Sequence, residues 1–202
     1  MRTGGDDIAQ VLALLGVCPE WEPMSGRVTG FKIIPYAALG RPRVDVTLRI
    51  SGFFRDAFPY QVELIDAVIQ RVAGLEEPEE FNPLAALARA EMMNLSSSEA
   101  NPETAFRRST MRIFGSKPGA YGAGLQSLID EGIWETKEDF ATAYLKWGSF
   151  VYGSKLEGET EEELFRTRLS KVQVVLHNQD NREHDILDLS LIHISEPTRL
   201  TS

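Results

Sequence analysis

Cysteine is nearly absent from this chain of 202 residues, which has Cys18 and no other. A single thiol excludes an internal disulfide framework and is typical of a protein kept in a reducing cytoplasm, the location expected here. Histidine is also scarce, and neither a pair of cysteines nor a His-Glu-x-x-His pattern occurs. A permanent zinc site is therefore not expected. No apolar run approaches the roughly eighteen residues that a membrane-spanning helix needs, so no membrane partner is expected.

Positive charge is in the minority. The chain has 21 Lys and Arg against 30 Asp and Glu, which gives a formal net charge of −9 at pH 7. Two acidic runs, at residues 76–80 and 157–163, hold much of the excess, and such runs usually form solvated faces or loops. Because binding to a phosphate backbone requires a basic surface, no nucleic acid is expected as a partner.

The glycine-rich segment Gly115–Gly124 matches neither common nucleotide-binding fingerprint. A Walker loop requires G-x-x-x-x-G-K-[ST], and Lys117 stands too early in the segment. The dinucleotide pattern G-x-G-x-x-G fails as well, because Ser127 occupies the place of its third glycine. Two interpretations remain open. Either the backbone N–H groups approach a flat or anionic ligand at a helix N-terminus, or the segment is a tight turn that merely needs glycine.

Apolar periodicity predicts a helix-rich α/β fold. The clearest helix is Phe58–Val72, in which apolar residues recur along one face. Further helices are predicted at residues 6–16, 84–93, 102–109, 124–131, 137–147 and 161–170, and strands at 27–34, 43–50 and 172–176. Since strands alternate with helices, we expect a short, mainly parallel sheet with helices packed on it.

The segment Arg43–Ile50 alternates between polar and apolar residues. Val44 begins the apolar set and Arg43 begins the polar set. A strand covered by helices on both faces would instead be apolar throughout. The polar face is therefore expected to border solvent, another domain or a cavity.

Three polar, turn-rich segments stand where a strand would be followed by a helix: Gly40–Pro59, Arg112–Gln126 and His177–Asp188. In open α/β sheets, ligands bind at the carboxyl ends of the strands, so these segments predict a site. In the first segment, Arg55 could hold a substrate carboxylate through its bidentate fork while Asp56 orients it. The alternative is a structural Arg–Asp pair that caps the helix and fixes the loop.

The third segment carries the richest cluster of ionisable side chains. Glu183, His184, Asp185 and Asp188 offer carboxylates and an imidazole within two helical turns. Such a set can supply a general base near neutral pH or a transient metal ligand. The alternative is an ordinary polar helix start.

Together, the three segments closely resemble the large subunits of the cobaltochelatase and magnesium chelatase H-subunit family, from about Met1 to Asp188. The resemblance implies a partial domain of a multidomain subunit of ATP-dependent cobaltochelatase. That enzyme inserts Co²⁺ into hydrogenobyrinic acid a,c-diamide during cobalamin (vitamin B12) biosynthesis. The resemblance also implies a corrinoid tetrapyrrole as substrate. Separate ATPase-type subunits would be the partners, using ATP and Mg²⁺ that this chain does not bind.

Two alternatives stay open beside that function. One is a magnesium chelatase H subunit, which inserts Mg²⁺ into protoporphyrin IX. The other is an inactive, truncated scaffold fragment. An imidazole at His184 suits Co²⁺ better than Mg²⁺, which prefers oxygen ligands, and this favours the cobalt enzyme.

The expected site residues fall into three groups. Substrate binding is expected of Arg55, Asp56, Lys117, Tyr121, Gly122 and Gly124. Catalysis is expected of Glu183, His184 and Asp185, with His184 and Asp188 as transient metal ligands. Four aromatic residues could form a platform for a tetrapyrrole, but their helical spacing is more typical of an ordinary core; they are Trp134, Tyr144, Trp147 and Phe150.

The last fourteen residues do not share the resemblance. Residues 189–202 look like the translation of a sequencing adaptor, so they are predicted to be a non-native, disordered tail. The expected boundaries are therefore 1–188 for the partial chelatase-like domain and 189–202 for the tail. His193 is excluded from the site on the same ground.

Overall fold

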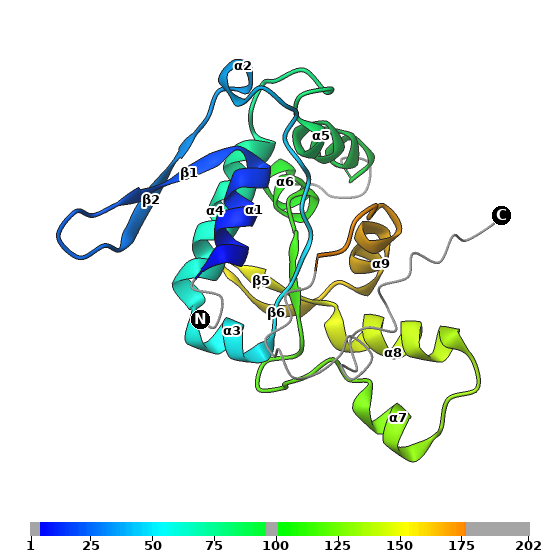
Figure 1. Ribbon diagram of the computed structural model, residues 1–202. Helices are drawn as coiled ribbons and strands as arrows, with labels where there is room; N and C mark the ends of the chain where they lie inside the picture. The colour runs from blue at the N-terminus through cyan, green and yellow to red at the C-terminus, as the bar shows by residue number, and fades with distance from the viewer. Residues whose placement is uncertain (1–4, 96–100, 177–202) are drawn as a thin grey trace.

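The computed structural model describes residues 5–95 and 101–176 (Figure 1). The helices are α1 (Asp6–Leu15), α2 (Tyr36–Leu39), α3 (Gly52–Ala57), α4 (Pro59–Ala73), α5 (Pro83–Leu95), α6 (Pro102–Ser109), α7 (Gln126–Glu131), α8 (Lys137–Gly148) and α9 (Glu162–Ser170). The strands are β1 (Val17–Trp21), β2 (Val28–Ile33), β3 (Leu48–Arg49), β4 (Ile113–Gly115), β5 (Phe150–Gly153) and β6 (Leu156–Thr160). The predicted helix-rich α/β class is confirmed. No described helix combines the length and the apolar character needed to cross a membrane.

The central sheet has four strands in the order β3-β4-β5-β6. Only the β3–β4 pair is parallel in the described part of the chain, and β4–β5 and β5–β6 are antiparallel. The prediction of a mainly parallel sheet is therefore wrong. The reason is local: β5 and β6 are joined by a tight turn at Ser154 and Lys155, and so short a connection can only return the chain antiparallel.

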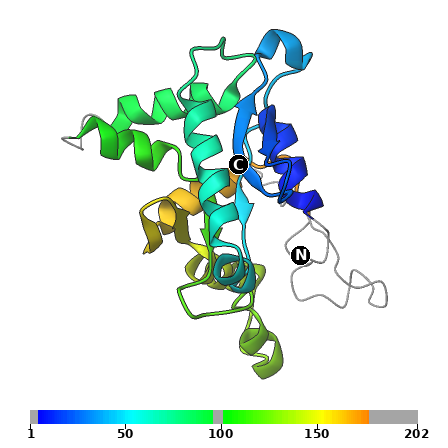
Figure 2. The same ribbon diagram turned by 90° about the vertical axis from the view of Figure 1, so that its left-hand side faces the viewer.

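A second, two-stranded sheet lies apart from the first. Strands β1 and β2 form an antiparallel hairpin, which projects away from the rest of the molecule (Figure 1). On another side, α5 and α6 run side by side as a helical hairpin (Figure 2). The predicted strand at residues 172–176 is wrong. This segment has no strand partner in the described part, and the side chains of Val174, Val175 and Leu176 are exposed.

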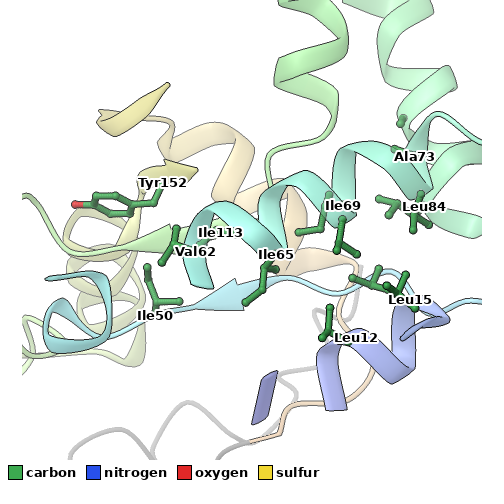
Figure 3. Packing of buried hydrophobic residues seen from close by; sticks show 14 residues of the cluster. Leu12, Leu15, Ile50, Val62, Ile65, Ile69, Ala73, Leu84, Ile113 and Tyr152 are labelled. Atoms are coloured by element: carbon green, nitrogen blue, oxygen red, sulfur yellow. The ribbon is translucent and has the colours of Figure 1, made fainter. Parts of the chain in front are cut away.

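Different helices cover the two faces of the central sheet. Alternation along β4 places Ile113 on one face and Phe114 on the other. Helices α1 and α4 pack on the first face, where Figure 3 shows Leu12, Leu15, Ile50, Val62, Ile65, Ile69, Ala73, Leu84, Ile113 and Tyr152 in one cluster. On the second face, α8 and α9 enclose Phe114 and Phe165, whose rings stack at 4.6 Å between centroids.

Helix α4 forms much as its sequence predicts. Pro59 fits the first turn because its missing N–H would have no partner there. Val62, Ile65 and Ile69 then recur on the face that is buried against the sheet. Burying each such side chain stabilises the fold by about 1.5–3 kcal/mol. The helix ends before Gly74, within one residue of the predicted end.

Segment 43–47 lies beside the core without forming a strand. Arg43 is only 1% exposed, and its guanidinium donates to the carbonyl oxygens of Leu15 (2.8 Å), Gly16 (3.0 Å) and Ile34 (2.7 Å). Val44, in contrast, is 41% exposed. The expectation of a polar face toward solvent or a cavity is therefore wrong at Arg43, because backbone acceptors from distant segments enclose its charge.

Candidate functional site

Two of the three predicted segments meet at one edge of the central sheet. Strands β3 and β4 are parallel, so the residues that follow them leave the sheet on the same side. Helix α3 follows β3, and a loop of residues 116–124, here called the glycine loop, follows β4. The contact is close at Gly52, where a Cβ atom would lie 2.5 Å from the carbonyl oxygen of Ala120. Only glycine fits this approach without displacing the loop.

Arg55 ties helix α3 to the glycine loop. The helix starts at Ser51, whose side chain accepts a hydrogen bond from the N–H of Phe54 and so places Arg55 on the second turn. Arg55 Nη1 donates to the carbonyl oxygens of Ser116 and Lys117, both at 3.0 Å. The other edge of the guanidinium donates to Asp56, from Nε at 2.6 Å and from Nη2 at 2.9 Å. The fork that could bind a substrate carboxylate is thus occupied by Asp56.

Asp56 and Tyr121 form the exposed part of this cluster. The Tyr121 hydroxyl donates to Asp56 Oδ2 at 2.8 Å, and the tyrosine is 60% exposed. Hydrogen bonds from Arg55 and then from Tyr121 lower the pKa of the Asp56 carboxyl, and this carboxylate in turn raises the pKa of Tyr121. At neutral pH the cluster therefore presents a carboxylate acceptor and a neutral phenol to solvent.

Several carbonyl oxygens of the glycine loop accept hydrogen bonds from side chains. Those of Ser116 and Lys117 face Arg55, while that of Gly122 accepts from Trp147 Nε1 at 3.0 Å and from Arg49 Nη2 at 3.4 Å. The backbone N–H groups of residues 121–124 donate to no acceptor in the described part of the chain. Consecutive N–H groups of this kind can receive an anion. Lys117 is exposed in the same loop.

Gly124 brings the loop against an aromatic side chain. Its φ of +76° is a left-handed conformation that favours glycine, and a Cβ there would lie 2.3 Å from the indole of Trp147. Trp147 is 37% exposed and Trp134 is 47% exposed. The prediction that these tryptophans belong to an ordinary core is therefore wrong, whereas Tyr144 and Phe150 are partly buried and pack beside the core. Helical spacing could not reveal this, because Trp134 precedes α8 and the Trp147 position on α8 is not covered by the core.

The third predicted segment lies outside the described residues. This applies to Glu183, His184, Asp185 and Asp188, and to the predicted tail at 189–202. The strand expected to lead into the segment does not form at residues 172–176. Within residues 5–95 and 101–176, no three His, Cys, Asp or Glu side chains gather closely enough to hold a metal ion.

A surface hollow of about 570 Å³ lies elsewhere, beside α6 and β6. It is lined by Glu103, Thr104, Arg107, Arg108, Met111, Leu156 and Glu161. None of the predicted substrate-binding residues borders it. Its arginines are already paired, Arg107 with Asp66 and Arg108 with Glu161, so the hollow offers little free charge to a ligand.

Comparison with known proteins places this geometry in context. Residues 1–193 match a family model described as CobN/Magnesium Chelatase. The aerobic cobaltochelatase subunit CobN of a Sinorhizobium species is 58% identical over 188 residues, which are 93% of this chain and 15% of that protein. The magnesium-chelatase H subunit of Chlorobaculum parvum is 31% identical over 192 residues, which are 94% of this chain and 14% of that protein.

A solved structure agrees with these relatives. The catalytic subunit of cobaltochelatase from Mycobacterium tuberculosis matches with a TM-score of 0.82 at 47% identity, over 91% of this chain and 15% of that one. The chain thus spans about 15% of the length of the cobaltochelatase subunits that it matches.

Proposed function

Because this chain belongs to the CobN/magnesium chelatase family, we propose that it forms part of the tetrapyrrole-binding wall of a cobaltochelatase large subunit. The whole enzyme would insert Co²⁺ into hydrogenobyrinic acid a,c-diamide during cobalamin biosynthesis in the cytoplasm. Identity of 58% to a cobaltochelatase subunit, against 31% to a magnesium-chelatase subunit, supports cobalt over magnesium. Partner subunits of the ATPase type would bind ATP and Mg²⁺, and the lack of a Walker loop in this sequence is compatible with that division.

The described residues are suited to gripping a substrate. Metal insertion requires bases that remove two pyrrole-type protons, groups that strip water from Co²⁺, and a pocket that holds the macrocycle. Asp56 can accept hydrogen bonds from substrate amides, and Lys117 can attract substrate carboxylates. Gly122 and Gly124 let a flat ring approach the loop backbone closely. We assign proton removal and contact with the metal to the segment that carries Glu183, His184, Asp185 and Asp188.

One observation carries the proposal: α3 and the glycine loop meet at the carboxyl ends of the parallel β3–β4 pair and are fastened there by Arg55. This is the place where open α/β sheets bind ligands. The contact leaves Asp56 and Tyr121 exposed on a supported surface, held by hydrogen bonds rather than free to swing.

The first test uses the intact large subunit that carries this segment. Lys117→Met and Asp56→Asn are expected to weaken tetrapyrrole binding, measured without ATPase partners, by about 10-fold each, the effect of losing one charge-assisted hydrogen bond. Lys171→Met is the control, because Lys171 is an exposed lysine at the end of α9. Unchanged affinity in both site variants would refute the proposal.

The second test separates binding from chemistry. His184→Ala in the same subunit, assayed with its ATPase partners, is expected to slow Co²⁺ insertion while substrate affinity stays normal. An unchanged insertion rate with normal affinity would leave this histidine a structural role.

A further inference from the structure

Arg49 is half-buried, and no carboxylate of the described residues pairs with its guanidinium. The fully buried arginines and the half-buried Arg107 do form ion pairs with an Asp or Glu: Arg43 with Glu77, Arg55 with Asp56, Arg107 with Asp66, Arg112 with Asp45 and Arg168 with Glu91. Among residues 5–95 and 101–176, no acidic side chain contacts Arg49. Removing part of a charge from water without a counter-charge is costly, so an anion beside Arg49 would stabilise it.

Among the described residues, the surroundings of Arg49 leave Nη2 as the part of its guanidinium open to a ligand, because Nη1 donates to the carbonyl oxygen of Ile50 and Nε is buried. Arg49 ends β3, and its guanidinium carbon lies 5.8 Å from the ring centre of Tyr144. Its Nε atom is buried without an acceptor and faces Gly148, where a Cβ would lie only 3.0 Å away. Nη2 reaches the glycine loop, 3.4 Å from the carbonyl oxygen of Gly122, and this contact is exposed. That distance is near the upper limit for a hydrogen bond, so an anion that took the place of the Gly122 oxygen would break only a weak interaction.

We propose that Arg49 binds a carboxylate of the tetrapyrrole substrate beside Gly122, at the edge of the glycine loop. The inference rests on the proposed function and assigns its anion-binding arginine. Arg55 is saturated by Asp56 and by loop carbonyl oxygens, whereas Arg49 has no carboxylate. The unbonded N–H groups of residues 121–124 lie in the same loop and can complete the coordination of the anion.

The electrostatics agree with this role. Burial lowers the pKa of Arg49, an effect partly offset by Coulombic interactions with Tyr144 and Tyr152, yet an arginine stays protonated at neutral pH. A carboxylate that accepts from Nη2 would form a charge-assisted hydrogen bond and supply the missing counter-charge. The same chemistry could come from an acidic side chain of the protein outside the described residues, so the test must separate the two sources.

The test compares two macrocycles in the intact large subunit without ATPase partners: the substrate with free carboxylates and its methyl ester. Arg49→Gln should weaken binding of the free acid by about 10- to 100-fold and leave binding of the ester nearly unchanged. Arg166→Gln is the matched control, since Arg166 is a half-exposed arginine paired with Glu162 on α9, and it should change neither affinity. Arg49→Lys keeps the charge but not the planar guanidinium, and should retain the fold and part of the preference for the acid.

Several results would overturn the inference. An equal loss of affinity for acid and ester would do so, as would no loss for either. A lower melting temperature of Arg49→Gln with an unchanged preference for the acid would assign the partner to the protein itself. If the unmodified subunit bound neither macrocycle, the proposed function would fail first, and this inference with it.

Discussion

Replacing Gly124 with alanine would force a methyl group into the indole of Trp147. The ideal Cβ position lies 2.3, 2.5 and 2.6 Å from three atoms of that side chain, far inside normal van der Waals contact. Alanine at a φ of +76° also strains the backbone, at a cost of about 1–2 kcal/mol. Overpacking adds about 1–3 kcal/mol. We therefore expect the free energy of unfolding to fall by about 2–5 kcal/mol.

Gly122→Ala is the matched control for this experiment. Gly122 lies in the same loop with a similar φ of +82°, but no atom lies within 4 Å of its ideal Cβ position. Gly122→Ala should therefore lower the free energy of unfolding only by the cost of backbone strain, about 1–2 kcal/mol. Urea denaturation of the 202-residue chain, followed by circular dichroism, measures both variants. An equal fall in the free energy of unfolding for Gly124→Ala and Gly122→Ala would refute the packing of Gly124 on Trp147. The packing would also be refuted if adding Trp147→Leu to Gly124→Ala recovered none of the lost stability.

Three further changes test other parts of the fold and the site. Asp56→Asn should make the melting temperature fall less steeply as the pH is lowered. The pKa of Asp56 is lowered in the folded state, so its pairing stabilises the protein above the unfolded value near 3.9 and is lost as pH falls through the folded value. Melting temperatures from pH 5 to pH 2 check this, and parallel curves for both proteins would contradict it. Arg107→Met should cost about 3–5 kcal/mol in urea, because it strands the buried Asp66 carboxylate; a loss below about 1 kcal/mol, the range of surface ion pairs, would show that the pair is unimportant. Asp139→Asn should cost about 0.5–2 kcal/mol by weakening the capping box of α8, while Glu138→Gln in the same turn should cost less, and equal losses would argue against the cap.

Local sequence patterns predicted the helices whose start and buried face depend on residues close by in the sequence. Helix α4 follows an apolar stripe, and α6 starts at Asn101 and Pro102, as such a cap and first turn should. The closeness of the first two polar segments, Gly40–Pro59 and Arg112–Gln126, could also be expected, because each stands where a strand would be followed by a helix. The short strands β5 and β6 were missed, although an aromatic and β-branched run at Phe150–Tyr152 followed by Gly-Ser is a recognisable hairpin signal.

Only the tertiary structure decided which charges are buried and what faces them. The alternation at Arg43 and Val44 predicts the opposite of their actual exposure, because the acceptors that enclose Arg43 come from segments up to 34 residues away. At Arg55 the sequence leaves open a substrate-binding fork or a pair with Asp56; the structure has the pair, and it adds loop acceptors 61 and 62 residues further along the chain. Periodicity reports the surface that a segment buries, but the partner of a charged side chain depends on chain crossings that no local pattern records. Arg49 and Arg55 therefore differ in availability for a physical reason: Asp56 and the glycine loop occupy Arg55, whereas no described carboxylate reaches Arg49.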